Sequence, residues 1–127
     1  MSPEKVLIVE DEPITLQALG MIVSSLGFEP VTATMAEDGL VLARQQPAPV
    51  AALVDLKLRG SAYDGLELIR RLREDSDQRG ESLRIVAHTA SVSRENQVAA
   101  QAAGADGMIL KPFRARDVAA ALEGLGP

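Results

Sequence analysis

Five short apolar runs, each followed by a stretch whose apolar residues recur at helical spacing, constrain the fold of this chain more than any other feature. The runs are Lys5–Val9, Phe28–Ala33, Val50–Leu58, Leu83–His88 and Gly107–Leu110. Short, continuous runs of this kind are typical of strands buried on both faces. Because strands and helices alternate strictly, we expect an α/β fold: a doubly wound parallel sheet with helices on both faces.

Apolar spacing and capping residues mark the five expected helices. Pro13 is well placed at the first position of the first helix, and Asp64 is a good N-cap for the third. In the third helix we expect Arg70, Arg71 and Arg73 to face water. The expected helices are 13–26, Glu37–Gln46, Gly65–Glu74, Arg94–Ala103 and Arg116–Leu125.

Length and composition exclude several classes of protein. A chain of 127 residues fits one domain, and we expect residues 1–127 to form it with no effector domain visible. A net charge of −5 disfavours direct nucleic-acid binding through a basic face. The absence of cysteine excludes disulfides, zinc thiolates and thiol catalysis. No signal peptide or long apolar run is present, so we expect a cytoplasmic protein without membrane contact.

Polar residues stand where the expected strands end. Glu10 and Asp11 follow the first strand, Asp55 lies near the end of the third, Thr89 follows the fourth, and Lys111 follows the fifth. In a sheet of order 2-1-3-4-5 these ends meet at the crevice where the chain reverses direction. Two carboxylates about 4 Å apart repel by about 4 kcal/mol at an effective dielectric of about 20. We therefore expect cations there: the lysine, and Mg²⁺, which prefers few carboxylates plus water and phosphate oxygens.

The chemistry that suits this set is phosphoryl transfer. A carboxylate such as that of Asp55 can act as a nucleophile and form an aspartyl phosphate. The Lys111 ammonium, the Thr89 hydroxyl and a metal ion are suitable donors for the phosphoryl oxygens. His88 is the only histidine, and we expect it to point away from the site because its neighbour Thr89 faces the site.

Four motifs give the chain a resemblance to the receiver domain of two-component response regulators over essentially its whole length. They are VEDE at 9–12, VDLKL at 54–58, TA at 89–90 and KPF at 111–113. The resemblance implies a flavodoxin-like sheet with five helices. It also implies a phosphorelay receiver that accepts a phosphoryl group from a histidine kinase or histidine phosphotransfer protein. Such a receiver catalyses only its own phosphorylation and dephosphorylation, and signals to a downstream protein as a monomer or weak dimer.

By position, the resemblance makes Asp55 the phosphoacceptor and one ligand of Mg²⁺. Asp11 corresponds to a direct metal ligand, and Glu10 to its companion, which usually acts through a water molecule. The main-chain carbonyl of Lys57 corresponds to a further ligand. The Lys57 side chain stands where the family tunes phosphorylation and dephosphorylation rates, as does Ser91, and we expect Lys57 to alter autodephosphorylation.

The resemblance also implies a switch. Thr89 corresponds to the hydroxyl that moves to bind the phosphoryl group, and Lys111 to the lysine that pairs with it. The Lys111–Pro112 bond is typically cis in the family. Met108 stands where the family usually has an aromatic switch residue, so the usual coupling between threonine and ring is altered. The loop between Asp55 and the next helix is two residues longer than is usual.

Other classes fit less well. A phosphatase of the haloacid-dehalogenase type requires a second acid two residues after the nucleophile, where Lys57 stands. An FMN-binding flavodoxin-like protein needs a hydroxyl- and glycine-rich loop after the first strand, where acids stand instead. Two alternatives stay open: a degenerate receiver that acts as a phosphorylation-independent interaction module, and a receiver excised from a larger regulator or hybrid kinase.

Overall fold

One parallel sheet forms the centre of the molecule. The computed structural model describes residues 2–91 and 93–125, and in them the strands pair in the order β2-β1-β3-β4-β5. The strands are β1 (Lys5–Val9), β2 (Glu29–Ala33), β3 (Ala51–Asp55), β4 (Arg84–Thr89) and β5 (Gly107–Leu110). All four pairings are parallel. The predicted order is therefore confirmed, and β1 and β3 lie side by side at the point where the chain reverses direction.

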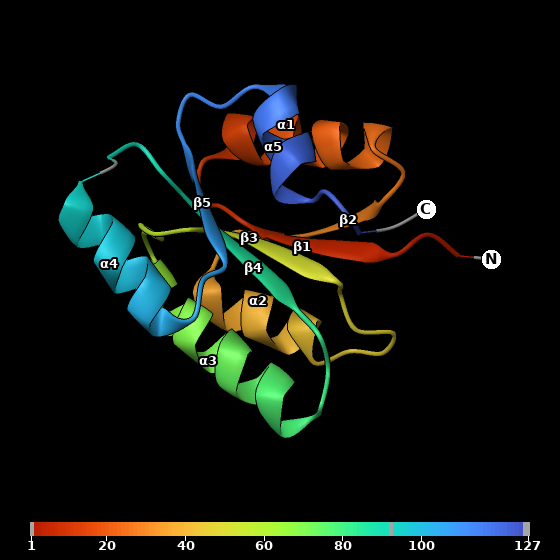
Figure 1. The fold of residues 1–127 in the computed structure, drawn as a ribbon, viewed down its shortest axis with the longest axis horizontal. Helices are drawn as coiled ribbons and strands as arrows, with labels where there is room; N and C mark the ends of the chain where they lie inside the picture. The colour runs from red at the N-terminus through yellow and green to blue at the C-terminus, as the bar shows by residue number, and fades with distance from the viewer. Residues whose placement is uncertain (1, 92, 126–127) are drawn as a thin grey trace.

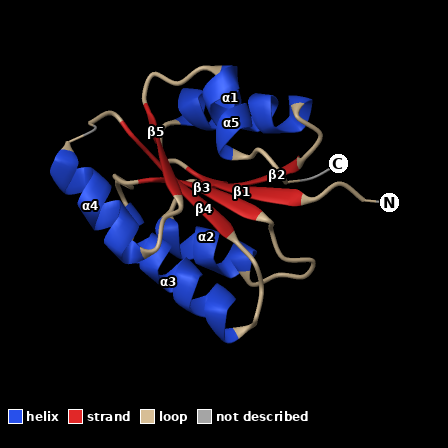
Figure 2. Cartoon of the chain, in the orientation of Figure 1, coloured by secondary structure: helices blue, strands red, loops and turns tan. Residues whose placement is uncertain are grey.

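Helices cover both faces of this sheet (Figure 1). One face carries α1 (Pro13–Ser25) and α5 (Ala115–Ala121), and the other carries α2 (Ala36–Ala43), α3 (Gly65–Gln78) and α4 (Arg94–Ala103). Figure 2 shows the strands in red between these two helical layers. In the described part of the chain, no helix is long and apolar enough to cross a membrane.

Several boundaries differ from the prediction by a few residues, and two of these differences have clear physical reasons. Helix α3 continues to Gln78, past the predicted end at Glu74. Ser76 is buried in this extra turn, and its hydroxyl donates a hydrogen bond of 2.7 Å to the carbonyl of Glu81. Strand β3 ends at Asp55 and not at Leu58, because the chain turns away from the sheet directly after the acid.

Side-chain caps fix where two of the helices begin. Glu12 is the N-cap of α1, and its carboxylate accepts hydrogen bonds of 3.1 Å from the backbone N–H groups of Ile14 and Thr15. Asp64 caps α3 as predicted, and accepts a bond of 3.0 Å from the N–H of Glu67. These caps satisfy N–H groups that have no partner within the helix. They set the direction in which the chain leaves the ends of β1 and of the loop after β3.

The apolar core is divided by the sheet into two clusters. Ile8 and Leu53 belong to the cluster beneath α1 and α5. Leu7 and Val54 belong to the cluster beneath α2, α3 and α4. Successive strand residues thus point to opposite faces although both faces are apolar. This alternation determines on which side of the sheet each polar residue at a strand end emerges.

Candidate functional site

Asp55 is fixed at the carboxyl end of β3. Its side chain is nearly buried, and Oδ1 accepts a hydrogen bond of 3.2 Å from the N–H of Lys57. Gly65, the first residue of α3, packs directly on the backbone at this point. A Cβ atom at Gly65 would lie 1.9 Å from the carbonyl oxygen of Asp55 and 2.7 Å from Cα of Leu56. Only glycine therefore lets α3 begin so close to the strand that carries the acid.

Lys111 joins two of the predicted acids. Its Nζ donates hydrogen bonds of 2.7 Å to Oε1 of Glu10 and 2.9 Å to Oδ2 of Asp55. The backbone N–H of Lys111 is held by the carbonyl of Thr89 at 2.8 Å, and the Lys111–Pro112 bond is cis, as predicted. Burial alone lowers the pKa of Lys111, but the hydrogen bonds and charges of Glu10 and Asp55 outweigh it and raise the pKa above its usual value. The ammonium is therefore a permanent positive charge on these carboxylates.

Glu10 is the most enclosed of the acids, with no exposed surface. One carboxylate oxygen accepts from Lys111, and the other accepts a bond of 3.0 Å from the N–H of Glu12. Burial raises the pKa of Glu10 to about 7, while the Lys111 and Glu12 hydrogen bonds act in the opposite direction. Burial is the larger effect because it removes water from the charged form.

Asp11 faces the loop that follows β3. Its Oδ2 accepts a hydrogen bond of 3.1 Å from the N–H of Arg59, and the Nε of the same arginine lies 3.8 Å away. The Arg59 side chain is 94% exposed, so this ion pair contributes little to stability. The backbone contact nevertheless ties the predicted longer loop to the acid beside β1. The structure thus places Glu10 and Asp55 on one lysine, and Asp11 at the edge of that pair.

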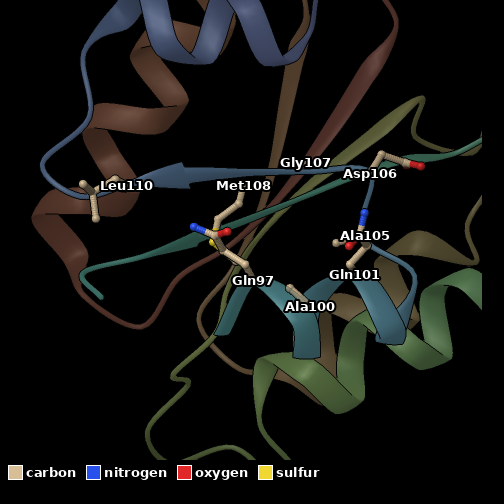
Figure 3. A pocket seen from close by; sticks show the side chains of 8 residues that line it. All are labelled: Gln97, Ala100, Gln101, Ala105, Asp106, Gly107, Met108 and Leu110. Atoms are coloured by element: carbon tan, nitrogen blue, oxygen red, sulfur yellow. The ribbon is translucent and has the colours of Figure 1, made fainter. Parts of the chain in front are cut away.

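Thr89, Ser91 and Met108 lie on the β4 and β5 side. The Thr89 hydroxyl exchanges hydrogen bonds with the backbone of Ser91, accepting from its N–H at 3.2 Å and donating to its carbonyl at 3.3 Å. Met108 is half-buried against the core beneath α2, α3 and α4. It lines a groove of about 480 Å³ between α4 and β5, together with Gln97 of α4 (Figure 3).

The prediction for His88 was wrong. In the β3–β4 pair, His88 is the register partner of Asp55, so both side chains emerge on the same face of the sheet. Its Nδ1 lies 3.6 Å from Oε1 of Glu10. Burial lowers the pKa of His88 to about 4, although the charge of Asp55 acts to raise it. The ring is therefore neutral near pH 7 and lies beneath the acids. Pairing the end of the fourth strand at His88 with Asp55, where β3 ends in the structure, places both on one face.

The His88 ring also lacks partners. Among the described residues, neither ring nitrogen has a partner in good hydrogen-bond geometry, although the nearby backbone of Leu53 acts to raise the pKa of His88, and the side chain is only 1% exposed. A buried polar group in this state costs about 1–3 kcal/mol. One ligand atom each from Glu10, Asp55 and His88 lies within 4.8 Å of the others. The site therefore contains a nitrogen donor in addition to the predicted acids.

The fold is that of a receiver domain. The chain belongs to the response regulator receiver domain family, whose family model matches residues 6–123. It is 35% identical over 116 residues to the transcriptional regulatory protein BaeR of Escherichia coli O6:H1, covering 91% of this chain and 45% of that protein. It is 35% identical over 117 residues to the photosynthetic apparatus regulatory protein RegA of Rhodovulum sulfidophilum, covering 91% of this chain and 60% of that protein. The chain thus spans about half the length of these relatives.

Solved structures of related proteins have the same fold. A CheY-like receiver domain protein from Methanospirillum hungatei superposes with a TM-score of 0.79 at 30% identity, covering 92% of this chain and 88% of that one. The chemotaxis protein CheY4 of Vibrio cholerae gives a TM-score of 0.83 over 95% of this chain and 97% of its own. Its identity is 24%, so it supports the fold alone. The flavodoxin-like architecture predicted from the sequence is confirmed.

Proposed function

We propose that this receiver accepts a phosphoryl group on Asp55 from the phosphohistidine of a histidine kinase or phosphotransfer protein. An oxygen of Asp55 forms the bond to phosphorus, the nitrogen–phosphorus bond of the donor breaks, and the donor imidazole keeps the electron pair. One observation carries the proposal: the Lys111 ammonium lies 2.9 Å from Oδ2 of a strand-end carboxylate at the switch point of the sheet. A positioned carboxylate and a fixed positive charge are what phosphoryl transfer requires.

The other residues of the set have supporting roles. Lys111 neutralises charge on the phosphoryl oxygens and holds the product carboxyl in place. Thr89, whose hydroxyl bonds only to Ser91 within the described chain, turns to donate to the phosphoryl group. Lys57 is exposed beside Asp55, and its charge alters the rate of phosphate loss. We expect that rate to change in Lys57→Asn, and an unchanged rate would rule out this role.

Receiver domains generally bind Mg²⁺, and the residues here fit it. The carboxylates of Glu10 and Asp55 share the Lys111 ammonium, and Asp11 lies at the edge of this pair, so negative charge is in excess. We propose that Asp11, Asp55 and the main-chain carbonyl of Lys57 hold the ion, with Glu10 acting through water. When bound, Mg²⁺ neutralises negative charge on the phosphoryl group. Hard oxygen donors with room for water suit this cation.

We propose that the output passes through protein–protein contact on the face of α4, β5 and α5. The groove between α4 and β5 supports this, because apolar Met108 and Leu110 line it together with the amides of Gln97 and Gln101. Val98 and Leu110 are 58% and 49% exposed on the same part of the molecule. A downstream protein would read changes that begin at Thr89 and Lys111. Since the chain spans about half of its relatives, the same face would also serve a receiver within a longer regulator.

Phosphorylation by acetyl phosphate with Mg²⁺, read by intact mass, tests the proposal. We expect one added phosphoryl group that is lost in Asp55→Asn. Asp38→Asn is the matched control, because Asp38 is an exposed acid on α2, and its adduct should persist. If no adduct forms and beryllofluoride leaves the NMR spectrum unchanged, the proposal fails. The domain would then be a phosphorylation-independent interaction module.

A further inference from the structure

The phosphoryl-transfer proposal gives no role to His88, although this ring lies against the acids. Its Nδ1 is 3.6 Å from Oε1 of Glu10, the side chain is 1% exposed, and within the described chain neither nitrogen has a hydrogen-bond partner. Buried polar groups are almost always partnered, so an unpartnered ring points to a ligand. A neutral imidazole is a common metal ligand.

The donor set around the ring is suited to a particular class of cation. Glu10, Asp55 and His88 each offer one ligand atom, and these atoms lie within 4.8 Å of one another. Carboxylate oxygen and imidazole nitrogen bind Zn²⁺ at about 2.0–2.2 Å, so a small inward movement of the side chains would complete the site. Mg²⁺ prefers oxygen donors in a near-ideal octahedron, whereas imidazole suits transition-series ions.

We propose that Glu10, Asp55 and His88 form a binding site for a transition-series divalent cation, of which Zn²⁺ is the best fit. This site differs from the magnesium position on Asp11, Asp55 and the Lys57 carbonyl. It lies deeper, because Glu10 and His88 are fully enclosed while Asp11 reaches the loop surface. Asp55 is the only direct ligand common to the two positions, since Glu10 acts on magnesium through water.

Lys111 and this cation exclude each other. The ammonium occupies the same carboxylates, at 2.7 Å from Glu10 and 2.9 Å from Asp55. Two positive charges cannot share that space, but the Lys111 side chain is 21% exposed and has a path to solvent. On the proposed function, a bound ion would oppose phosphorylation, because it occupies an oxygen of Asp55 and displaces the lysine.

Nitrogen NMR on the imidazole tests the site directly. His88 is the only histidine in the sequence, so its side-chain ¹⁵N resonances are unambiguous. We expect Zn²⁺, added to the whole chain in excess Mg²⁺, to shift the resonance of one ring nitrogen at one equivalent. Absence of Zn²⁺ binding, or binding that leaves both nitrogen resonances unchanged, overturns the proposal. No phosphoryl donor is present, so the result is independent of the proposed function.

Three variants locate the ion. His88→Leu should lower the affinity for Zn²⁺, measured by titration calorimetry in excess Mg²⁺, by at least about tenfold. Lys111→Met should raise it several-fold, because the competing ammonium is gone. Asp38→Asn is the matched control, because Asp38 is an exposed acid on α2 outside both metal positions, and it should leave Zn²⁺ affinity unchanged. Equal affinities in the wild type and His88→Leu would overturn the assignment of His88. If that variant folds poorly, the ¹⁵N shift of the wild type still tests the assignment, because it is measured separately.

Discussion

Nδ1 of His88 and Oε1 of Glu10 lie 3.6 Å apart in the buried layer beneath Asp55, and burial moves their pKa values in opposite directions. The pKa of Glu10 is raised from 4.5 to about 7, and the pKa of His88 is lowered from 6.5 to about 4. Near pH 5.5 both groups are therefore neutral in the folded protein and charged in the unfolded chain. Each group alone makes stability depend on pH, and in the wild type the two dependences oppose each other.

Single variants should separate the two dependences. In Glu10→Gln only His88 contributes. Its lowered pKa gives stability that is complete above pH 6.5 and lost as the pH falls through about 4. In His88→Leu only Glu10 contributes. Its raised pKa gives stability that is complete below pH 4.5 and lost as the pH rises through about 7. The slopes should approach about 1.4 kcal/mol per pH unit with opposite signs.

Urea unfolding at a series of pH values, in metal-free buffer, measures both slopes. The double variant Glu10→Gln/His88→Leu is the reference, because it keeps every other titrating group. Between pH 4.5 and 6.5 the free energy of unfolding, relative to this reference, should rise with pH in Glu10→Gln and fall in His88→Leu. Slopes of the same sign would show that burial does not control one of the two pKa values.

The sequence predicted the sheet and the meeting of Glu10 and Asp55 with Lys111, but not the surroundings of His88. Continuous apolar runs reveal a buried strand without revealing which face each residue occupies, because both faces are apolar. The side of His88 depends on its register with Asp55, which is set by pairing between β3 and β4. The prediction that Arg73 faces water was also wrong. A long side chain can enter a packed region that its position on the helix does not indicate.

The ion pair between Lys111 and Glu10 should show strong energetic coupling. Lys111→Met leaves the enclosed Glu10 carboxylate without its ammonium partner. We expect a loss of roughly 1–3 kcal/mol at pH 8, where Glu10 is ionised in the folded protein. Glu10→Gln in the same background should restore most of this loss. Lys57→Met is the control, because that side chain is exposed and should change stability by less than about 0.5 kcal/mol.

A double-mutant cycle from urea unfolding curves measures this coupling. We expect an interaction energy of about 0.5–3 kcal/mol between Lys111 and Glu10. The coupling should shrink at pH 5, where Glu10 is protonated and the pair is no longer ionic. Additive effects at both pH values would contradict the pairing.

Two helical glycines should respond oppositely to alanine. At Gly65 the new Cβ atom would lie 1.9 Å from the carbonyl oxygen of Asp55, so the start of α3 must move away from β3. We expect Gly65→Ala to destabilise the fold by about 1–3 kcal/mol. Gly20, inside α1, has no atom within 4 Å of an added Cβ, and Gly20→Ala should stabilise by about 0.5–1 kcal/mol. Urea unfolding of the two variants separates the steric effect from the helix-propensity effect. Equal changes in the free energy of unfolding would refute the close approach at Gly65.

Arg73 connects α3 to the two loops that flank β4 and β5. Its Nε and Nη2 donate to the carbonyl of Gly104 at 3.1 and 2.9 Å, and its Nη1 donates to the carbonyl of Leu83 at 2.9 Å. Nη2 also pairs with Asp106 at 2.7 Å. A lysine cannot reproduce this planar fork, so Arg73→Lys should cost about 1–3 kcal/mol. Arg70→Lys is the matched control, because that arginine is an exposed residue of the same helix.

Hydrogen exchange should localise the effect of Arg73→Lys. Amides near Gly104 and Asp106 should exchange faster in this variant, because the loop between α4 and β5 loses its partner on α3. The exchange at β1, which is separated from β4 by β3, should change only through global stability. If Arg73→Lys and Arg70→Lys had equal unfolding midpoints and equal exchange at this loop, the arginine would be a solvated surface residue, as its helical position first suggested.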